Sequence, residues 1–340
     1  MICTQNNLVD KYGRIAKKLR ISVTDRCNMR CIYCMPTNNT KWFDDMEVLT
    51  FNEIDRLVSI FVNLGIERIR ITGGEPLVRP NLESLINSIA LKPKIKSIGM
   101  TTNGLLLENK VEQLVTAGLS SVNISIDTFK ENKFKMMTGV EGVNKVFSSI
   151  MRAKEVGLEV KINTVIIRGW NDDEIVDFAS FAKEEDCAVR FIEFMPLDGT
   201  GIWQPNLVFS KAEMMERINA KVGKIVTSCN DNKDGSSNSE PATIYSFAEG
   251  KGVVGFIPSI TEPFCTNCDR ARITSDGRFL TCLFDNHSYD LKGLLRSGAT
   301  DDDIKKYINQ SMTQKPEGII RIIKNDNLKP ALNLMHTIGG

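Results

Sequence analysis

The stretch Cys27-Asn-Met-Arg-Cys31-Ile-Tyr-Cys34 holds three of the nine cysteines of this 340-residue chain. A single disulfide bond would leave one of these thiols over, and a tetrahedral zinc site needs four ligands. Thiolates at such close spacing can instead surround a cubane iron–sulfur cluster. Three ligands leave one iron open to another molecule, which is typical of a catalytic cluster rather than one that only transfers electrons.

Two other interpretations of these cysteines remain open. Positions i, i+4 and i+7 share one face of a helix, so the thiols would also suit a buried helix. Charged neighbours such as Asp25 and Arg30 suit a core helix poorly, however. A zinc site would need a fourth ligand from elsewhere in a chain with only two histidines, His287 and His336. The stretch therefore favours an iron–sulfur cluster.

Composition restricts the partners and the compartment. The formal net charge is +1, from 43 basic and 42 acidic residues, so nothing in the overall charge favours nucleic acid or a membrane surface. No apolar run approaches the roughly 18–20 residues of a membrane span, and the N-terminus carries no signal or transit pattern. Clustered cysteines are typical of reduced thiols. We expect a cytoplasmic monomer or homodimer without nucleic-acid or membrane partners.

Residues 17–195 alternate strand-like runs with amphipathic helical patterns. The strand-like runs lie at 19–23, 68–72, 97–102, 121–126, 160–167 and 189–195. The helical patterns lie at 51–65, 81–91, 110–118, 143–157 and 172–185. Six such repeats predict parallel strands with right-handed crossovers. The pattern fits either a doubly wound sheet or an incomplete TIM-type barrel, and both place their chemistry at the carboxyl ends of the strands.

Polar and glycine residues occur at these strand ends. The run Gly73-Gly-Glu-Pro76 follows the second strand, the run Thr101-Thr-Asn-Gly104 ends the third, and Ser125 and Asp127 end the fourth. Glycines at a strand end allow the backbone to approach a ligand closely. Glu75 adds an acceptor for an ammonium group, so we expect a ligand at this rim.

A second cysteine group follows residue 200. Ser210 and Glu213 open a helical pattern as a capping pair. Farther on, Cys265, Cys268 and Cys282 form the pattern C-x2-C-x13-C, and a predicted turn at 274–278 makes a hairpin that returns Cys282 to the first two. Half of a zinc ribbon is one interpretation. Because the chain already carries the first cysteine motif, a second iron–sulfur cluster is favoured over zinc. We expect two regions, 1–200 and 201–340.

Basic residues are concentrated on the predicted strands. Arg270 and Arg272 alternate along one strand, which places both guanidinium groups on the same face. Arginine makes forked contacts with phosphate. The other strand cations are Arg20, Arg70, Lys161 and Arg190. Six cations directed at one cavity of a nearly neutral chain predict a highly charged anionic ligand.

The first motif, C-x3-C-x-aromatic-C with Tyr33 as the aromatic residue, resembles the signature of the radical S-adenosylmethionine (SAM) superfamily. The resemblance implies a 4Fe-4S cluster whose open iron binds the amino and carboxylate groups of SAM. An electron from the cluster then cleaves SAM to give a 5′-deoxyadenosyl radical. The residues implied in SAM binding are Tyr33, Gly74, Ser125 and Met195, with Glu75 as an additional contact.

Within that superfamily the chain resembles the GTP 3′,8-cyclase family of molybdenum cofactor biosynthesis. The resemblance includes "LRISVTDRCNMRCIYCMP", "IRITGGEPLVR", "FCTNCDRARITSDGRFLTCLF" and the terminal "IGG". It implies an incomplete (βα)6 TIM-type barrel, a C-terminal segment with an auxiliary 4Fe-4S cluster, and GTP as substrate. The residues implied in GTP binding are Arg20, Arg70, Thr101, Lys161, Arg270, Ala271 and Arg272. Arg190, Gly339 and Gly340 are expected to contribute as well.

The same resemblance implies the partners. An electron donor would supply the reducing equivalents, and a separate cyclic pyranopterin monophosphate synthase would rearrange the cyclised product. Two other functions remain open: a radical SAM enzyme with an auxiliary cluster that acts on a peptide, and a non-enzymatic iron–sulfur scaffold. Cys3, Cys187 and Cys229 match no ligand position and are interpreted as ordinary free cysteines.

Overall fold

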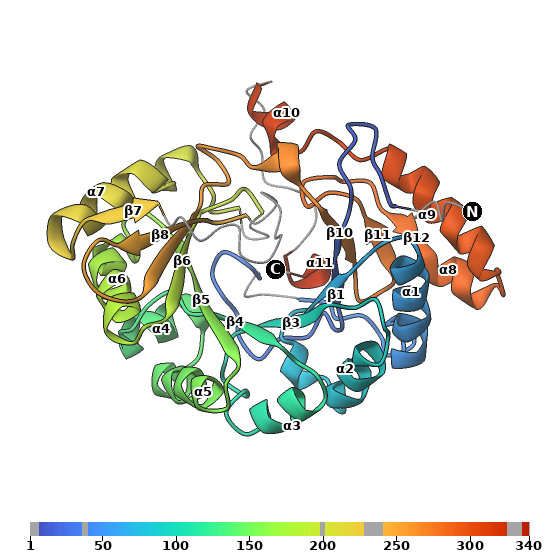
Figure 1. Cartoon of the computed structure of the whole chain (residues 1–340), viewed down its shortest axis with the longest axis horizontal. Helices are drawn as coiled ribbons and strands as arrows, with labels where there is room; N and C mark the ends of the chain where they lie inside the picture. The colour runs from blue at the N-terminus through green and yellow to red at the C-terminus, as the bar shows by residue number, and fades with distance from the viewer. Residues whose placement is uncertain (1–6, 36–39, 198–200, 228–240, 325–334, 340) are drawn as a thin grey trace.

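The computed structural model describes residues 7–35, 40–197, 201–227, 241–324 and 335–339 (Figure 1). Six strands lie side by side in chain order, and each pairs in parallel with the next. They are β1 (Lys18–Ser22), β2 (Arg68–Thr72), β3 (Ser97–Thr102), β4 (Ser121–Ser125), β5 (Glu159–Ile166) and β6 (Ala188–Glu193). A doubly wound sheet would reverse its strand order at a switch point. The observed order confirms the incomplete barrel.

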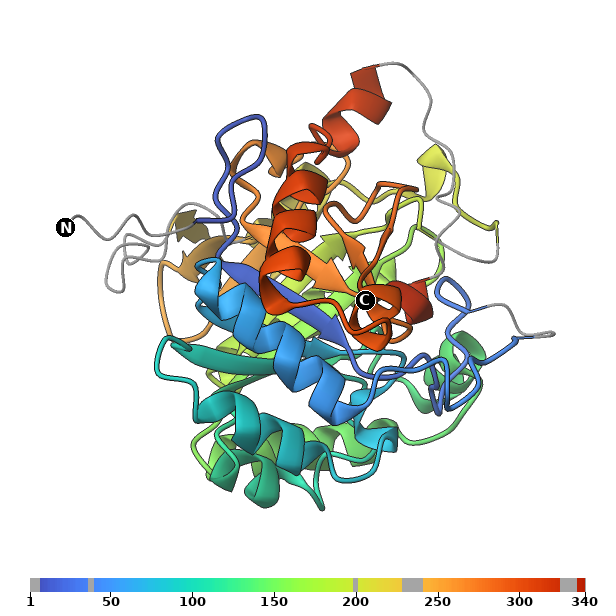
Figure 2. The same ribbon diagram turned by 90° about the vertical axis from the view of Figure 1, so that its right-hand side faces the viewer.

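Six helices connect these strands and cover the outside of the arc (Figures 1 and 2). They are α1 (Phe51–Asn63), α2 (Leu82–Ala90), α3 (Val111–Thr116), α4 (Glu131–Thr138), α5 (Val143–Glu155) and α6 (Ile175–Glu184). Helix α1 shows why they form: Thr50 and Glu53 make a capping box, and Ile54, Leu57 and Phe61 recur along one face and are buried. Five of the six coincide with predicted helices, whereas α4 was not predicted.

The C-terminal half extends the same sheet on both sides. Beside β1 lie β10 (Arg270–Ile273), which is parallel to it, and the antiparallel strands β11 (Arg278–Leu280) and β12 (Tyr289–Asp290). Beside β6 lie β9 (Val253–Ile257), which is parallel to it, and the antiparallel strands β8 (Thr243–Phe247) and β7 (Ile225–Thr227). Strands from regions 1–200 and 201–340 therefore share one twelve-stranded sheet.

The remaining helices flank the sheet or enter the arc. They are α7 (Lys211–Lys221), α8 (Leu291–Arg296), α9 (Asp301–Thr313), α10 (Ile319–Lys324) and α11 (Met335–Ile338). The described residues also form four short 3-10 turns: η1 (Pro76–Val78), η2 (Asp172–Glu174), η3 (Pro205–Leu207) and η4 (Cys265–Asn267). Helix α7 begins at the predicted capping box of Ser210 and Glu213. Helix α11 lies inside the arc of strands, which brings the C-terminal end of the chain to the centre of the molecule (Figure 1).

One continuous apolar core fills the space between the strands and the outer helices. Phe61 of α1, Phe178 of α6 and Phe191 of β6 are fully buried in it. Because strand side chains alternate, the residues between these core positions face the inside of the arc. No helix in the described residues combines the length and apolar character needed to cross a membrane.

Candidate functional site

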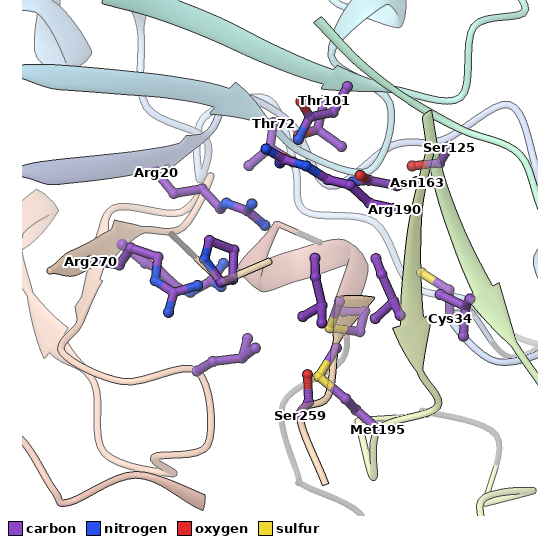
Figure 3. A pocket seen from close by; sticks show the side chains of 18 of the residues that line it. Arg20, Cys34, Thr72, Thr101, Ser125, Asn163, Arg190, Met195, Ser259 and Arg270 are labelled. Atoms are coloured by element: carbon purple, nitrogen blue, oxygen red, sulfur yellow. The ribbon is translucent and has the colours of Figure 1, made fainter. Parts of the chain in front are cut away.

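A single cavity of about 300 Å³ lies inside the arc and brings both cysteine groups together. Figure 3 shows Arg20 and Arg270 on one side of it, and Cys34 and Met195 on the other. The cysteines that line it are Cys27, Cys31, Cys34, Cys265, Cys268 and Cys282. In the described part of the chain, no three histidine, cysteine or carboxylate side chains converge closely enough to hold a single metal ion.

The first cysteine group lies on an irregular loop beyond the carboxyl end of β1. Residues 27–31 have no helical conformation, so the buried-helix interpretation is wrong. The loop is anchored by Arg30 and Ile32, whose backbone N–H groups donate to the carbonyl oxygens of Thr138 and Met137 at 2.7 and 2.9 Å. The end of α4, the helix that was not predicted, therefore holds the cysteine loop against the barrel.

The thiols of this loop are poorly stabilised as free thiolates. Burial raises the pKa of Cys27 to about 11 and that of Cys34 to about 12, and it raises the pKa of Cys31 well above its usual value. Neighbouring thiols reinforce the increase for Cys31 and Cys34. A bound metal reverses this preference because it deprotonates a coordinating thiol. The donor set therefore fits a metal cluster with three thiolate ligands.

The glycine run after β2 packs directly on the start of the cysteine loop. Gly74 donates its N–H to the carbonyl oxygen of Thr24 at 2.7 Å, and Glu75 donates to that of Arg26 at 2.8 Å. A Cβ on Gly74 would lie 2.4 Å from the Arg26 oxygen, and one on Gly73 would lie 2.6 Å from the Thr24 oxygen. Both positions thus require glycine, and both glycines line the cavity.

We expect Gly74→Ala to force this run and the cysteine loop apart. The added methyl group would meet rigid backbone rather than a side chain that can rotate away. The substitution should lower the free energy of unfolding by at least about 2 kcal/mol, as overpacking of a tight contact does. Denaturant unfolding of the metal-free protein measures this loss. Gly157→Ala is the control, since a Cβ there meets nothing within 4 Å, although its φ of +77° makes some strain unavoidable. Equal losses for both variants would contradict the packing argument.

Glu75 is buried and does not line the cavity. Its carboxylate accepts hydrogen bonds from the Thr102 hydroxyl at 2.7 Å, the Asn103 N–H at 2.7 Å and the Leu77 N–H at 3.0 Å. Burial raises its pKa to about 7, although these hydrogen bonds oppose the increase. Glu75 thus joins the loops that follow β2 and β3, instead of offering an acceptor to the cavity as expected.

The expected residues near the first cysteine loop lie together. Tyr33, Gly74, Ser125 and Met195 all line the cavity. The Tyr33 hydroxyl donates to Asp127 at 2.6 Å, which fixes the ring beside Cys34. Burial raises the pKa of the Asp127 carboxyl to about 6, against the effect of this hydrogen bond. Asp127 was not among the predicted binding residues, although it directly follows a predicted strand.

Four buried side-chain oxygens on the cavity wall have no hydrogen-bond partner within the described residues. They belong to Thr101, Asn163, Ser259 and Thr281. Asn163 stands in register between Ser125 on β4 and Arg190 on β6, so one polar row crosses three strands. Arg190 lines the cavity as expected (Figure 3). Because unsatisfied buried polar atoms are costly, this wall is suited to a polar ligand.

Arginines gather on the opposite wall. Arg20 on β1 stands in register between Arg70 on β2 and Arg272 on β10, and Arg270 lies two residues before Arg272 on the same strand. Burial and mutual repulsion lower the pKa of Arg20 well below its usual value and lower that of Arg272 to about 10. Such a group of cations is stabilised by a multiply charged anion placed among them.

The described end of the chain reaches these cations. The Gly339 carbonyl oxygen accepts hydrogen bonds from Arg272 at 2.8 Å and from Arg20 at 3.4 Å. Gly339 therefore contacts two arginines of the cavity wall, although it does not line the cavity itself. Gly340 falls outside the described residues.

Three of the seven residues implied in GTP binding do not line the cavity. Arg70 donates to the carbonyl oxygen of Met100 at 3.1 Å and to Asn123 at 3.3 Å. Lys161 forms an ion pair of 2.6 Å with Glu159, near the start of β5. Ala271 is fully buried in the core, because strand alternation turns it away from the two arginines. Arg20, Thr101, Arg270 and Arg272 line the cavity.

Glycine makes room for the guanidinium group of Arg70. Gly99 faces it on the neighbouring strand β3, and a Cβ there would lie 2.5 Å from Arg70 Cζ and 2.7 Å from Ser121 Oγ. Gly255 plays a similar part beside Arg190, where the contact would be 3.2 Å. Two strand glycines thus set the position of two arginine side chains.

The two cysteine groups lie at opposite ends of neighbouring strands. The first group follows the carboxyl end of β1, whereas Cys265 and Cys268 precede the amino end of β10, which is parallel to β1. Strand β11 runs back, so Cys282 also returns to that amino end. Chemistry was expected at the carboxyl ends of the six barrel strands; the second group lies at the other end, because its hairpin enters from that side. Five residues of β1 place the groups roughly 17 Å apart along the strand.

The thiols of the second group, Cys265, Cys268 and Cys282, differ in the direction in which their pKa values shift. Burial raises the pKa of Cys282 to about 11. Burial would do the same to Cys268, but Arg270 and Lys315 outweigh it and lower that pKa to about 7. Three thiols around one end of the cavity, one of them inclined to be a thiolate, again fit a metal cluster with three thiolate ligands.

The comparisons agree with this arrangement. Residues 21–182 match the family model of the radical SAM superfamily, and residues 187–320 match that of Molybdenum Cofactor Synthesis C. The GTP 3′,8-cyclase of Thermodesulfovibrio yellowstonii is 43% identical over 333 residues, covering 97% of this chain and 99% of its own. The mitochondrial GTP 3′,8-cyclase of Arabidopsis thaliana is 39% identical over 331 residues, covering 96% and 83%.

Among solved structures, Streptococcus suis SuiB bound to S-adenosylmethionine superposes with a TM-score of 0.59. The match covers 92% of this chain and 76% of SuiB, at 18% sequence identity. At that identity the similarity shows a shared fold.

Proposed function

We infer that this chain, which belongs to the radical SAM superfamily and within it to the GTP 3′,8-cyclase family, converts GTP to (8S)-3′,8-cyclo-7,8-dihydroguanosine 5′-triphosphate. This lyase reaction belongs to molybdenum cofactor biosynthesis. The observation that supports it best is one cavity with three cysteines at each end and arginines between them. We also propose that residues 1–200 form the radical SAM core and that residues 201–340 carry the second cluster.

We propose that Cys27, Cys31 and Cys34 hold a 4Fe-4S cluster and that its open iron binds SAM. When bound, this cluster supplies the electron that cleaves SAM. Gly74 allows the backbone to approach SAM closely, while Tyr33, Ser125 and Met195 enclose it. The hydrogen bond to Asp127 keeps the Tyr33 ring in place. These residues position and shield the reacting groups rather than exchange protons with them.

We propose that GTP lies between the two cysteine groups. Its triphosphate would replace repulsion among Arg20, Arg270 and Arg272 with charge-assisted hydrogen bonds. Thr101, which lines the same cavity, would contribute from β3, and Arg70 and Lys161 would act from just behind the cavity wall. The guanine would then face the cluster held by Cys265, Cys268 and Cys282. This placement holds ribose C3′ and guanine C8 for the new bond between them, in a cavity that excludes water.

The test is anaerobic incubation of the reconstituted protein with SAM, GTP and dithionite, followed by mass spectrometry. We expect 5′-deoxyadenosine together with a cyclised GTP product. If 5′-deoxyadenosine forms without a nucleotide product, the protein is a radical SAM enzyme with another substrate, such as a peptide. If neither forms in protein that holds about eight irons, a scaffold function takes its place.

Two partners follow from the chemistry of this proposal. The cleavage of SAM consumes an electron, so a one-electron donor must reach the chain. The product retains a triphosphate and a new carbon–carbon bond, which a cyclic pyranopterin monophosphate synthase would rearrange in the next step.

We expect Gly99→Ala to weaken GTP binding by displacing Arg70. The new methyl group would lie 2.5 Å from the guanidinium carbon, so the side chain must leave its hydrogen bonds to Met100 and Asn123. Losing one charged contact of about 1.5 kcal/mol raises KM for GTP roughly tenfold. Steady-state kinetics measure the change. Gly255→Ala should have a smaller effect because its contacts start at 3.0 Å. An unchanged KM in Gly99→Ala would exclude Arg70 from GTP binding.

A further inference from the structure

The segment Lys315–Ile320 wraps around the loop that carries Cys265 and Cys268. Lys315 is buried, with 1% of its surface exposed. Its ammonium group donates to the carbonyl oxygen of Arg270 at 2.9 Å and to that of Cys268 at 3.4 Å. A buried cation thus holds the backbone on the far side of the loop from the cavity, which Lys315 does not line.

The same segment is tied to the other end of the loop by Arg14. Its guanidinium group donates to the carbonyl oxygens of Cys265 at 2.8 Å, Pro316 at 2.7 Å and Glu317 at 3.2 Å. Arg14 also pairs with the buried carboxylate of Asp10 at 2.5 Å, so its charge is compensated locally. Arg14 therefore fastens the loop without adding an uncompensated charge.

The backbone of the segment completes the contact. A Cβ on Gly318 would lie 2.6 Å from the sulfur of Cys265, and its φ of +110° also favours glycine. The N–H groups of Ile319 and Ile320 are directed at the Cys265 thiol. Backbone N–H groups and a lysine thus contact the second cysteine group; Ile319 also lines the cavity, whereas Lys315 does not.

Lys315 differs from Arg14 in its charge balance. Within the described residues its ammonium group contacts only carbonyl oxygens and has no carboxylate partner. It acts electrostatically on the thiols of both Cys268 and Cys282. When the second cluster is bound, its thiolate ligands and the cluster itself therefore supply the negative charge that acts on the Lys315 ammonium group.

We propose that Lys315 is a positioning residue that fixes the loop of the second cluster and raises the reduction potential of that cluster. The proposal rests on the second cluster of the proposed function. A fixed positive charge in a buried setting favours whichever oxidation state is more negative, and one-electron reduction adds a negative charge to the cluster. The electron comes from the external donor, and Lys315 itself is neither oxidised nor reduced.

The test uses three variants of the full-length reconstituted protein. Lys315→Met removes the charge and the hydrogen bonds, Lys315→Gln removes the charge but keeps a donor, and Lys315→Arg keeps both. Lys306→Met, on the exposed side of α9, is the matched control. Iron content and electron paramagnetic resonance during a redox titration give the readouts. The signal that changes when SAM is added identifies the first cluster, and the other signal identifies the second.

At a fixed potential, we expect Lys315→Gln to lower the reduced-to-oxidised ratio of the second cluster about tenfold, which equals ~59 mV for a one-electron couple. Lys315→Met should show the same shift with partial loss of the second cluster. The reduced-to-oxidised ratio of the first cluster should stay near the wild-type value in every variant. In the Lys315→Arg and Lys306→Met proteins, the ratio of the second cluster should stay near the wild-type value as well. A Lys315→Gln protein with two clusters and the wild-type ratio would overturn this proposal alone. Wild-type protein that binds only one cluster would overturn the proposed function along with it.

Discussion

Replacing Cys31 by serine is expected to abolish the cleavage of SAM. Cys31 is the central thiol of the first loop, and its carbonyl oxygen accepts the N–H groups of Cys34 and Met35 at 3.0 and 3.1 Å. Serine preserves the size and this backbone turn but removes a thiolate ligand, so only two of three remain. The iron content should fall from about eight to about four per chain. Formation of 5′-deoxyadenosine should fall to the background level of the protein-free mixture.

Two further variants make this result specific. Cys187→Ser changes a buried cysteine that lies in the apolar core, far along the chain from both groups, and should retain both clusters and full SAM cleavage. Cys268→Ser should keep the first cluster and still release 5′-deoxyadenosine, but without the cyclised nucleotide. SAM cleavage at the wild-type rate by the Cys31→Ser protein would remove the first loop from the proposed chemistry.

Replacing Arg272 by alanine is expected to separate SAM cleavage from GTP cyclisation. Arg272 is buried, lines the cavity and stands in register with Arg20. Its loss would remove the charge-assisted hydrogen bonds that we propose it makes to the triphosphate, and a loss of about 3 kcal/mol lowers kcat/KM for GTP roughly a hundredfold. The first cluster lies at the other end of β1, so 5′-deoxyadenosine formation without GTP should be unchanged.

The hairpin itself offers a matched control for Arg272. Arg278 lies on the adjacent strand β11 but is exposed and pairs with Asp276 at 3.1 Å. Arg278→Ala should therefore retain GTP cyclisation. Arg272→Lys should recover little activity, because a point charge cannot make the two parallel hydrogen bonds of a guanidinium group. Equal kinetics for the alanine variants at positions 272 and 278 would contradict a triphosphate at this wall.

The strands of the barrel were predictable because their pattern is local. All six predicted strand runs coincide with β1 to β6, and five helices follow from apolar faces with clear ends. The choice between a doubly wound sheet and a barrel stayed open because strand order depends on pairing between distant segments. Helix α4 was missed because only Phe134, Met137 and Thr138 are buried in it, and lysines and other polar residues surround them in the sequence. This is too few apolar positions to show a helical repeat. The sheet extensions β7, β8, β9 and β12 were missed because they lie outside the strand–helix repeat of residues 17–195, and no repeating pattern marks them.

Site residues could be predicted from the sequence where the chemical type of the side chain is enough to indicate its role. Cysteine spacing and strand arginines identified all six thiols and the cationic wall. Ser259 and Thr281 were missed, since a lone hydroxyl has no pattern and Ser259 follows a strand that was not predicted. Glu75 and Ala271 were predicted to contact a ligand but do not line the cavity. Whether a side chain is buried, and which way it points, depends on how the elements pack together. Lys315 also carried no signal, because only the fold brings residue 315 next to residue 268.

The open twelve-stranded sheet also has a consequence for solubility. A sheet that does not close exposes unpaired backbone groups at its two outermost strands, and these can recruit strands from other molecules into aggregates. Within the described residues, the outermost strands are short: β12 has two residues and β7 has three. Such brief edges give a second chain little to hydrogen-bond with. The molecule can therefore leave its barrel open to admit a large nucleotide without becoming a template for fibril growth.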